Sequence, residues 1–296
     1  MSKRKPIRLA HISDMHCYRL TLSLTQFLSK RWLGNINVLV NRRISFHKDP
    51  NSNLLDLFHS QGVNHVIVSG DVSTTSLSEE FAVAAEFMKE LEDRGMKTHL
   101  IPGNHDNYTR QAHRQGLFYQ FFDGASDGHD FHLREEKVAL RRLGDNCWLI
   151  GLDTTIPTPL LLSKGVFSEA IEANLEQLLK EIPSDHHVIL TNHFPLFETV
   201  HPSHDLERSP ALRNLLKSYP NVRLYLHGHV HRQSIRDKRR MKLPICLNSG
   251  SCGLKRRATC HIIDLTDEGC EVAVWRYHQR KTAGLWKEAR RASFQW

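Results

Sequence analysis

Five separate apolar segments of this 296-residue chain end in acidic, amide or imidazole side chains. They are IRLAHISDMH, VNHVIVSGDV, KTHLIPGNHD, HHVILTNHFP and VRLYLHGHVH. Each begins as a buried strand would and stops in polar residues. Because the carboxyl ends of strands in an α/β sheet meet in one crevice, we expect these polar side chains to share a site. The candidates are Asp14, His16, Asp71, Asn104, His105, Asp106, His193, His229 and His231.

Helical patterns alternate with these strands. The helix expected after the second strand has Ser76 or Ser78 as its cap, and the next is opened by Ser168. After residue 243 the chain has strand patterns without helices between them. Strands alternating with helices, followed by a run of strands, indicate an α/β protein whose mixed sheets are covered by helices. The expected helices are 76–95, 168–183 and 211–220.

The chain is predicted to form a single domain, residues 1–296, since it shows no internal repeat, low-complexity linker or domain boundary. Two segments interrupt the alternation, at about 17–60 and about 107–145. Both are longer than ordinary connections. We expect them to act as insertions that cover the strand ends, because loops commonly carry specificity in α/β proteins.

The net charge and the cysteine content limit which classes of partner and which cellular compartment are expected. The formal net charge of +8 and the pI near 9.2 favour anionic partners such as nucleotides, phospholipid headgroups or nucleic acid. The six cysteines lack CxxC spacing, and the amino terminus has only a short apolar run. We therefore expect a reduced, cytoplasmic protein without a secretory signal. No apolar segment approaches the roughly 20 residues that cross a bilayer.

The spacing of the polar residues favours a metal site. Asp14 and His16 are two residues apart, as are His229 and His231, so each pair faces one way on an extended chain. Gly228 would let the backbone approach closely and turn there. Four imidazoles, two carboxylates and an amide oxygen suit two ions that share a carboxylate. Nitrogen and oxygen donors without thiolate favour Mn²⁺, Fe or Zn²⁺ over Ca²⁺ or a lone Mg²⁺.

Each of these residues also has a structural explanation when it is considered alone. Asp and Asn favour turns after strands, and an isolated histidine is commonly a core residue. The joint occurrence at five strand ends is what favours the metal site. His227 matches no such position, so we expect it to be structural or to support a ligand.

The motifs DMH, GDV, GNHD, NHFP and GHVH, in this order from Asp14 to His231, resemble the five blocks of calcineurin-like metallophosphoesterases. The resemblance covers most of the chain, since the strands from Pro244 to His278 resemble that family's carboxyl-terminal sheet. It implies a four-layer α/β/β/α sandwich with two mixed sheets and the metal site at the strand ends. It also implies a metal-dependent hydrolase of phosphoric esters or pyrophosphates.

The family pattern, applied position by position, implies a role for each motif residue. A hydroxide shared by the two ions would attack phosphorus in line. His105 would protonate the leaving oxygen or stabilise its charge, and Asp106 would orient the ring of His105. One ion would be held by Asp14, His16, Asp71 and His231, and the other by Asp71, Asn104, His193 and His229.

The chain differs from several branches of the family at motif positions, and these differences narrow the range of substrates that the resemblance implies. The chain has GDVSTTS and GNHD where phosphoprotein phosphatases of the family have Asp-Arg-Gly and a Glu after GNH. Thr74 stands where purple acid phosphatases have a metal-binding Tyr. Little sequence remains after Trp275 for the capping domain of the family's nucleases. With these branches set aside, the chain resembles class III cyclic-nucleotide phosphodiesterases and UDP-2,3-diacylglucosamine pyrophosphatases. A major group of those pyrophosphatases has Arg in place of His105.

The insertion at 17–48 is basic and amphipathic. It has six Lys or Arg and no Asp or Glu, and its apolar residues recur near helical spacing. Such a segment lies at an anionic membrane surface, covers the acyl chains of a lipid substrate, or packs on the domain as a lid. The lipid alternatives make UDP-2,3-diacylglucosamine, cleaved to a lipid monophosphate and UMP in lipid A biosynthesis, the sharper substrate hypothesis.

Three hypotheses stay open: a lipid-nucleotide pyrophosphatase peripheral to the inner face of the membrane, a cyclic-nucleotide or general phosphodiesterase, and a non-catalytic scaffold. The basic residues lack interleaved aromatics for stacking bases, and 236–242 is expected to be a solvated hairpin, so nucleic acid is disfavoured. Substrate contacts are not assigned by the motifs. The candidates for them are Arg19, Arg110, Arg114 and His201, with His204 beside them.

Overall fold

The computed structural model describes residues 7–18, 50–159, 162–254, 257–279 and 284–296. Arg19, a candidate for substrate contact, and most of the basic amphipathic segment 17–48 lie outside the described residues. The remainder of the first insertion, Pro50–Ser60, forms helix α2. Its residues Leu54 and Phe58 are fully buried in the core.

The first large sheet is mixed. Strands β1, β2 and β3 are parallel, because α2 and α3 connect them. Strands β14, β15 and β16 follow one another closely along the chain and pair antiparallel, with β14 beside β1. In sheet order the strands are β16 (Leu285–Gln295), β15 (Gly269–His278), β14 (Thr259–Leu265), β1 (Ile7–Ile12), β2 (His65–Val68) and β3 (Lys97–Leu100).

The second large sheet has parallel strands at its centre and an antiparallel strand at each edge. Helix α5 (Glu169–Glu181) connects β7 to β9, and helix α6 (Ser209–Lys217) connects β9 to β11. In sheet order the strands are β12 (Ser234–Asp237), β13 (Ile245–Asn248), β11 (Val222–His227), β9 (His187–Thr191), β7 (Cys147–Leu152) and β6 (Val138–Gly144).

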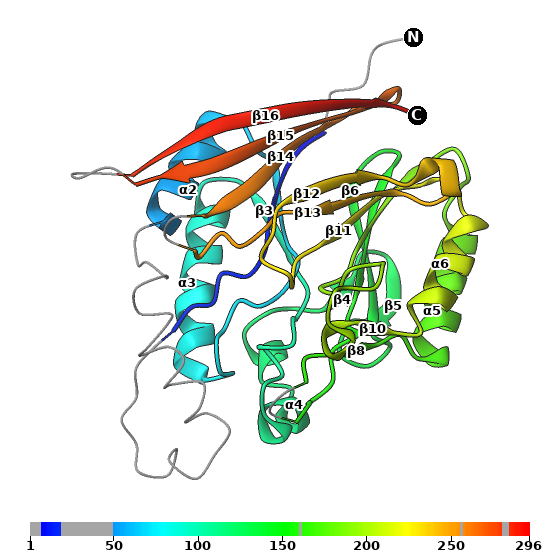
Figure 1. The fold of residues 1–296 in the computed structure, drawn as a ribbon, viewed down its shortest axis with the longest axis horizontal. Coiled ribbons are helices and arrows are strands. Elements are labelled where there is room, and N and C mark those ends of the chain that lie inside the picture. The colour runs from blue at the N-terminus through cyan, green and yellow to red at the C-terminus, as the bar shows by residue number, and fades with distance from the viewer. Residues whose placement is uncertain (1–6, 19–49, 160–161, 255–256, 280–283) are drawn as a thin grey trace.

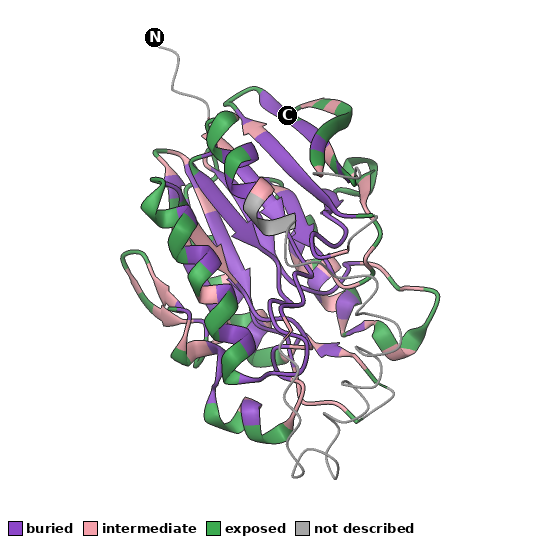
Figure 2. Ribbon diagram, turned by 90° about the vertical axis from the view of Figure 1, so that its left-hand side faces the viewer, coloured by how far each residue is buried: buried purple, intermediate pink, exposed green. Residues whose placement is uncertain are grey.

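The two sheets face each other, with α2 and α3 (Ser78–Asp93) outside the first and α5 and α6 outside the second (Figure 1). Aliphatic residues such as Leu9, Ile67, Leu149 and Leu226 form the core between the sheets. The helices expose one face and bury the other against the strands (Figure 2). The α/β/β/α sandwich with two mixed sheets is therefore confirmed.

Two segments differ from the expectation. The last part of the second insertion, at about 107–145, is not a covering loop but the edge strand β6, whose Val138–Leu140 side chains are buried. Strand β16 was not expected, since most of its side chains are exposed and polar.

Short elements complete the described part of the chain: α4 (Arg110–Gln115), η3 (Phe118–Gln120), β4 (Ala125–Ser126), β5 (His129–His132), β8 (Gly165–Val166), η4 (Pro202–His204), β10 (Leu206–Glu207) and η5 (Arg239–Met241).

Helix α3 begins differently from the expectation. Neither Ser76 nor Ser78 caps it, and Leu77 occupies the cap position. The buried carboxylate of Glu80 instead accepts hydrogen bonds from the backbone N–H groups of Thr74, Thr75 and Leu77. Glu80 therefore anchors the loop that follows the GDV motif as well as the helix. The Ser168 cap of α5 is confirmed, because its side chain accepts from the N–H of Ile171.

Glu80 is expected to make the stability of the fold depend on pH. Burial raises the pKa of Glu80 from 4.5 to about 7, although the hydrogen bonds to its carboxylate oppose the rise. Between these values the folded carboxyl keeps a proton that the unfolded chain has lost. The free energy of unfolding should therefore fall as the pH rises from 4.5 to 7. Glu80→Gln should flatten that slope in urea unfolding, whereas Glu79→Gln, at an exposed position, should leave it. An unchanged slope in Glu80→Gln would contradict the assignment.

All six cysteines are buried free thiols. Among the described residues, every helix is too short or too polar to cross a bilayer.

Candidate metal centre

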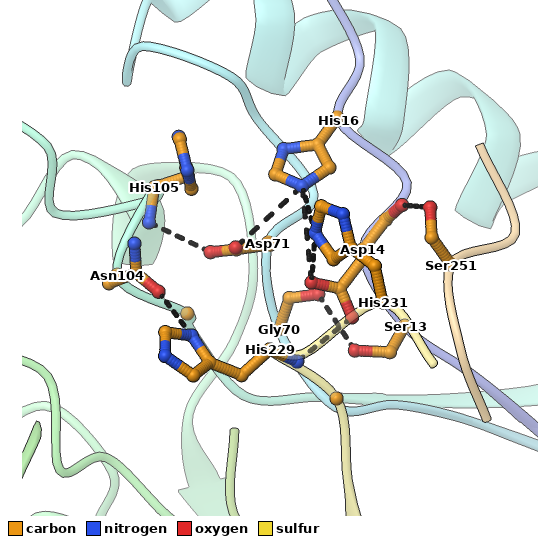
Figure 3. A network of polar contacts seen from close by, with 12 residues as sticks. Ser13, Asp14, His16, Gly70, Asp71, Asn104, His105, His229, His231 and Ser251 are labelled. Atoms are coloured by element: carbon orange, nitrogen blue, oxygen red, sulfur yellow. Dashed lines mark hydrogen bonds and ion pairs between the residues drawn. The ribbon is translucent and has the colours of Figure 1, made fainter. Parts of the chain in front are cut away.

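The polar residues of the five motifs meet at the carboxyl ends of strands from both sheets. Asp14 and His16 follow β1, Asp71 follows β2, and Asn104 follows β3. His193, His229 and His231 follow β9 and β11 of the facing sheet. Figure 3 shows side chains of these two sheets turned toward one another. The structure brings all seven side chains, from distant parts of the chain, to one place.

One group of donors lies around Asp14. Its Oδ1 is 3.0 Å from Nε2 of His231, which is 3.0 Å from Nε2 of His16. Nε2 of His16 is in turn 3.8 Å from Oδ2 of Asp71. Ligand atoms of these four residues lie within 4.8 Å of one another, as those of a metal site do.

A second group lies beside it and includes the same oxygen of Asp71. Oδ2 is 3.3 Å from Nε2 of His193, which is 3.2 Å from Oδ1 of Asn104. Nδ1 of His229 is 2.9 Å from that amide oxygen and 3.3 Å from Nε2 of His193. Oδ2 of Asp71 is therefore the atom common to both groups.

These separations suit ligands that share a cation. Donors bound to one ion at about 2.1 Å stand roughly 3.0–3.4 Å apart in tetrahedral or octahedral geometry. Ring nitrogens face each other in two pairs, His16 with His231 and His193 with His229. A neutral imidazole carries a proton on only one of its two nitrogens, so the other nitrogen can bind a metal ion. The groups thus fit two ions bridged by a carboxylate.

The electrostatics of the centre also favour cations. Although burial opposes ionisation, the imidazoles of His193, His105 and His16 hold the pKa of Asp71 well below its usual range. Burial lowers the pKa of His193, but the carboxylates of Asp71 and Asp14 and the carbonyl of Ser69 together outweigh burial and raise that pKa to about 9. Metal binding must displace this proton, so loading is favoured as the pH rises.

Backbone geometry aims these side chains into the centre. Five of the seven residues have a left-handed backbone, a conformation that costs a non-glycine residue on the order of 1–3 kcal/mol and that concentrates at functional sites. The surrounding fold must hold them there. Their φ angles are 55° at Asp14, 50° at His16, 56° at Asp71, 72° at His229 and 50° at His231.

Glycines bring the loops close enough to form the centre. A Cβ on Gly70, where φ is 97°, would lie 2.7 Å from Nδ1 of His193. A Cβ on Gly228 would overlap Oγ of Ser13 and Oδ2 of Asp14. The expected close approach at Gly228 is thereby confirmed, since the N–H of His229 also donates to Oδ2 of Asp14 at 3.1 Å.

Gly228→Ala is expected to weaken metal binding. The added methyl group would push the His229 loop away from Asp14, so metal affinity should fall by roughly 10- to 100-fold, as for other losses of support around ligands. Elemental analysis of the purified protein after dialysis against Mn²⁺ measures this. Val230→Ala changes an exposed side chain of the same loop and serves as the matched control. Full metal content in Gly228→Ala would show that the loop tolerates the methyl group.

His105 lies beside the donor groups, but Thr74 rather than Asp106 orients its ring. Nδ1–H of His105 donates to the carbonyl oxygen of Thr74 at 2.7 Å, and the ring stacks on Tyr108 at a centroid distance of 5.5 Å. The carboxylate of Asp106 accepts from the N–H groups of Gly103, Val72 and Ser73 and from the Ser73 hydroxyl. The predicted role of Asp106 is corrected: it ties together the loops that carry Asp71 and His105.

His227 does not join either donor group. Its Nδ1 is 3.2 Å from the amide nitrogen of Asn248, and burial lowers its pKa to about 4. This agrees with a structural role behind His229.

A cavity of about 900 Å³ opens beside the donor groups and is lined by Asp71, Asn104, His105, His229 and His231 together with other residues. Of the substrate-contact candidates, His201 and His204 line it. Arg110 and Arg114 lie on α4 and are exposed, and within the described chain neither lines this cavity.

Three further lining residues, Ser163, Arg232 and Arg236, were not among the candidates from the sequence. Ser163 and His204 meet across the cavity wall, with Oγ 2.8 Å from Nδ1, because β8 and β10 pair beside them. Arg232 and Arg236 lie on the β12 side. Only the position of Arg232 directly after GHVH could have indicated this wall.

Residues 7–233 match the family model for calcineurin-like phosphoesterases. The chain belongs to this family. Family membership assigns this phosphoesterase to the metal-dependent phosphoester hydrolases, and it implies a substrate that contains phosphate. The predictions of family, of an enzyme and of a metal-binding hydrolase are confirmed.

Solved structures show the same fold at low sequence identity. A dimetal phosphatase from Danio rerio is 13% identical with a TM-score of 0.64, over 97% of this chain and all of that one. PhoD is 10% identical with a TM-score of 0.65, over 99% of this chain and 70% of that one. A purple acid phosphatase from yellow lupin is 11% identical with a TM-score of 0.62, over 98% of this chain and 54% of that one. No curated protein sequence matches this phosphoesterase.

Proposed function

We propose that this phosphoesterase hydrolyses a phosphodiester or pyrophosphate bond with two divalent ions bound at the strand ends. The observation that carries the proposal is the position of Asp71 Oδ2, 3.8 Å from Nε2 of His16 and 3.3 Å from Nε2 of His193, in both donor groups. The proposed ligands are Asp14, His16, Asp71 and His231 for one ion and Asp71, Asn104, His193 and His229 for the other.

When bound, the two ions supply Lewis acidity, which lowers the pKa of water for attack on phosphorus and neutralises charge on the phosphoryl oxygens. The chain's own residues position the groups and move the proton. His105 delivers a proton from Nε2 to the leaving oxygen, while its Nδ1–H stays on the Thr74 carbonyl. Glu80 fixes that carbonyl in place by accepting from the N–H of Thr75, which belongs to the same planar peptide unit.

Mn²⁺ is the proposed ion, with Fe and Zn²⁺ as alternatives. The donors are imidazole nitrogens with carboxylate and amide oxygens, which suit these ions. Cys17 stays out of the proposed ligand set, since the ligand atoms that gather around Asp14 come from Asp14, His16, Asp71 and His231.

The proposed substrate is a lipid-linked nucleotide, with UDP-2,3-diacylglucosamine as the specific candidate. The size of the cavity supports a substrate with more than a scissile phosphate, because small-molecule sites span about 300–1,000 Å³. Its wall combines apolar residues such as Leu196 and Phe197 with basic Arg232. That mixture suits an anionic group beside an apolar one.

A substrate comparison with the purified, Mn²⁺-loaded chain tests this proposal. UDP-2,3-diacylglucosamine should exceed cyclic AMP and bis(p-nitrophenyl) phosphate in kcat/KM by at least about 100-fold, because binding energy from remote groups raises that ratio. Asp71→Asn controls for contaminating hydrolases. A preference for cyclic AMP would replace the lipid substrate with a cyclic nucleotide.

We also propose that segment 17–48 brings a single-domain, cytoplasmic protein to a membrane or covers the acyl chains of its substrate. The basic and apolar residues of that segment support this. The full chain should sediment with vesicles rich in phosphatidylglycerol and not with phosphatidylcholine vesicles. Equal sedimentation with both would contradict membrane recognition through charge.

A further inference from the structure

We infer that Arg232 and Arg236 form a binding subsite for a second phosphoryl group, adjacent to the one that is attacked. The inference rests on the proposed function and adds a residue-level reason for preferring pyrophosphate diesters, R–O–P–O–P–O–R′, to simple phosphodiesters.

The first observation is the location of the two arginines. Both line the same 900 Å³ cavity as Asp71, His105 and His231. Arg232 follows His231 directly in the chain. Arg236 lies on the edge strand β12, two residues from Ser234, which lines the cavity too. Residues two apart on a strand share a face, so the cavity side of β12 presents Arg236.

The pairing of β12 agrees with this orientation. Arg236 lies opposite Cys246 of β13 in the antiparallel ladder, and Cys246 also lines the cavity. Directly opposed residues of such a ladder point to the same face.

The second observation is charge. Across the described part of the chain, no carboxylate forms an ion pair with Arg232 or Arg236, although neighbouring arginines are paired. Arg213 lies 2.9 Å from Glu198, and Arg239 lies 2.7 Å from Asp237. The cavity wall therefore keeps two uncompensated positive charges.

The described acids on this wall are already engaged. Asp71 lies between the two donor groups, and Glu198 forms an ion pair with Arg213. Two divalent ions would neutralise the attacked phosphoryl group by themselves. The arginines are thus left for another anion, and a guanidinium matches the oxygens of a phosphate through two parallel hydrogen bonds.

A phosphoryl group joined to the scissile one satisfies these requirements best. Both then lie in one cavity, one at the ions and one at the arginines. Nucleic acid is less well matched, since backbone binding draws on an extended series of cations, whereas two line this cavity.

The test uses two probes that differ only by one phosphoryl group: P1,P2-bis(p-nitrophenyl) pyrophosphate and bis(p-nitrophenyl) phosphate. The full, Mn²⁺-loaded chain is compared with Arg232→Gln and Arg236→Gln. Each variant should lower kcat/KM for the pyrophosphate by about tenfold or more, as expected for loss of a charge-assisted hydrogen bond. It should change kcat/KM for the phosphate by less than about threefold. Arg240→Gln, at an exposed position on η5 away from the cavity lining, should change neither.

Several results would contradict the proposed subsite. Equal losses on both probes would place the arginines at the attacked group, and no loss on either would remove them from binding. A variant whose only change is weaker inhibition by duplex DNA would assign the arginines to nucleic acid. If the wild-type chain hydrolyses neither probe, the proposed function fails, and calorimetric binding still decides the subsite. The pyrophosphate must then bind more tightly than the phosphate, and Arg236→Gln must remove that difference.

Discussion

Asp71→Asn is expected to reduce kcat/KM by at least about 1,000-fold, which corresponds to roughly 4 kcal/mol of transition-state stabilisation. Oδ2 of Asp71 is the oxygen that lies in both donor groups. A neutral amide lacks the charge needed to bridge two divalent ions, so the substitution should cost at least one of them. Kinetics with bis(p-nitrophenyl) phosphate and elemental analysis of bound Mn²⁺ measure the two effects separately.

The fold should survive this substitution, because Oδ1 of the new side chain can still accept from the N–H of His105, at 2.7 Å in the native chain. Circular dichroism checks this. Asp264→Asn is the matched control: its carboxylate pairs with Arg8 between β1 and β14 and belongs to neither donor group. Asp71→Asn protein with two bound ions and more than about a tenth of native activity would refute the bridging role.

The seven ligand candidates could be predicted from the sequence because each one ends a strand whose apolar residues are plain. Ile67 and Leu226 are fully buried between the sheets, so their strands are recognisable, and the parallel order of β1, β2 and β3 brings Asp14 and Asp71 to one edge. A residue that directly follows a strand in the sequence also lies at the carboxyl end of that strand in space. This is why the motif positions coincide with the donor groups.

Contacts made by the backbone could not be predicted in this way. The carbonyl of Thr74 orients His105, and any residue type supplies a carbonyl. Asp106 follows His105 directly, which suggested that it supports the ring, yet its carboxylate accepts N–H groups from two loops instead. The left-handed backbone at His229 has no sequence signature either, since glycine is the residue that normally marks it.

The cavity-lining residues Ser163 and Arg236 were missed for a different reason. Ser163 and His204 are 41 positions apart, and the two-residue strands β8 and β10 that bring them together are too short to show a pattern. Arg236 belongs to a basic run that was expected to be a solvated hairpin, and its position in the β12–β13 pairing is what turns it toward the cavity. Tertiary pairing decides which charges of such a run face a site.

His105→Ala should affect hydrolysis according to the leaving group. The Thr74 carbonyl accepts from Nδ1–H, so Nε2 is the atom that delivers a proton to the departing oxygen. Loss of general acid catalysis typically costs about 10²- to 10⁴-fold. We expect a loss of that size for an alkyl ester, whose alkoxide leaves poorly without a proton. A p-nitrophenyl ester should lose less than about tenfold, since p-nitrophenolate needs little protonation.

Metal content distinguishes this effect from damage to the centre. His105 contributes no atom to the two donor groups, so His105→Ala should keep its bound Mn²⁺, whereas His231→Ala should lose it because Nε2 of His231 lies 3.0 Å from both Asp14 Oδ1 and His16 Nε2. The two variants therefore separate proton delivery from metal binding. Equal losses by His105→Ala on alkyl and p-nitrophenyl esters, with Mn²⁺ retained, would mean that the imidazolium stabilises charge on the phosphoryl group and transfers no proton to the leaving oxygen.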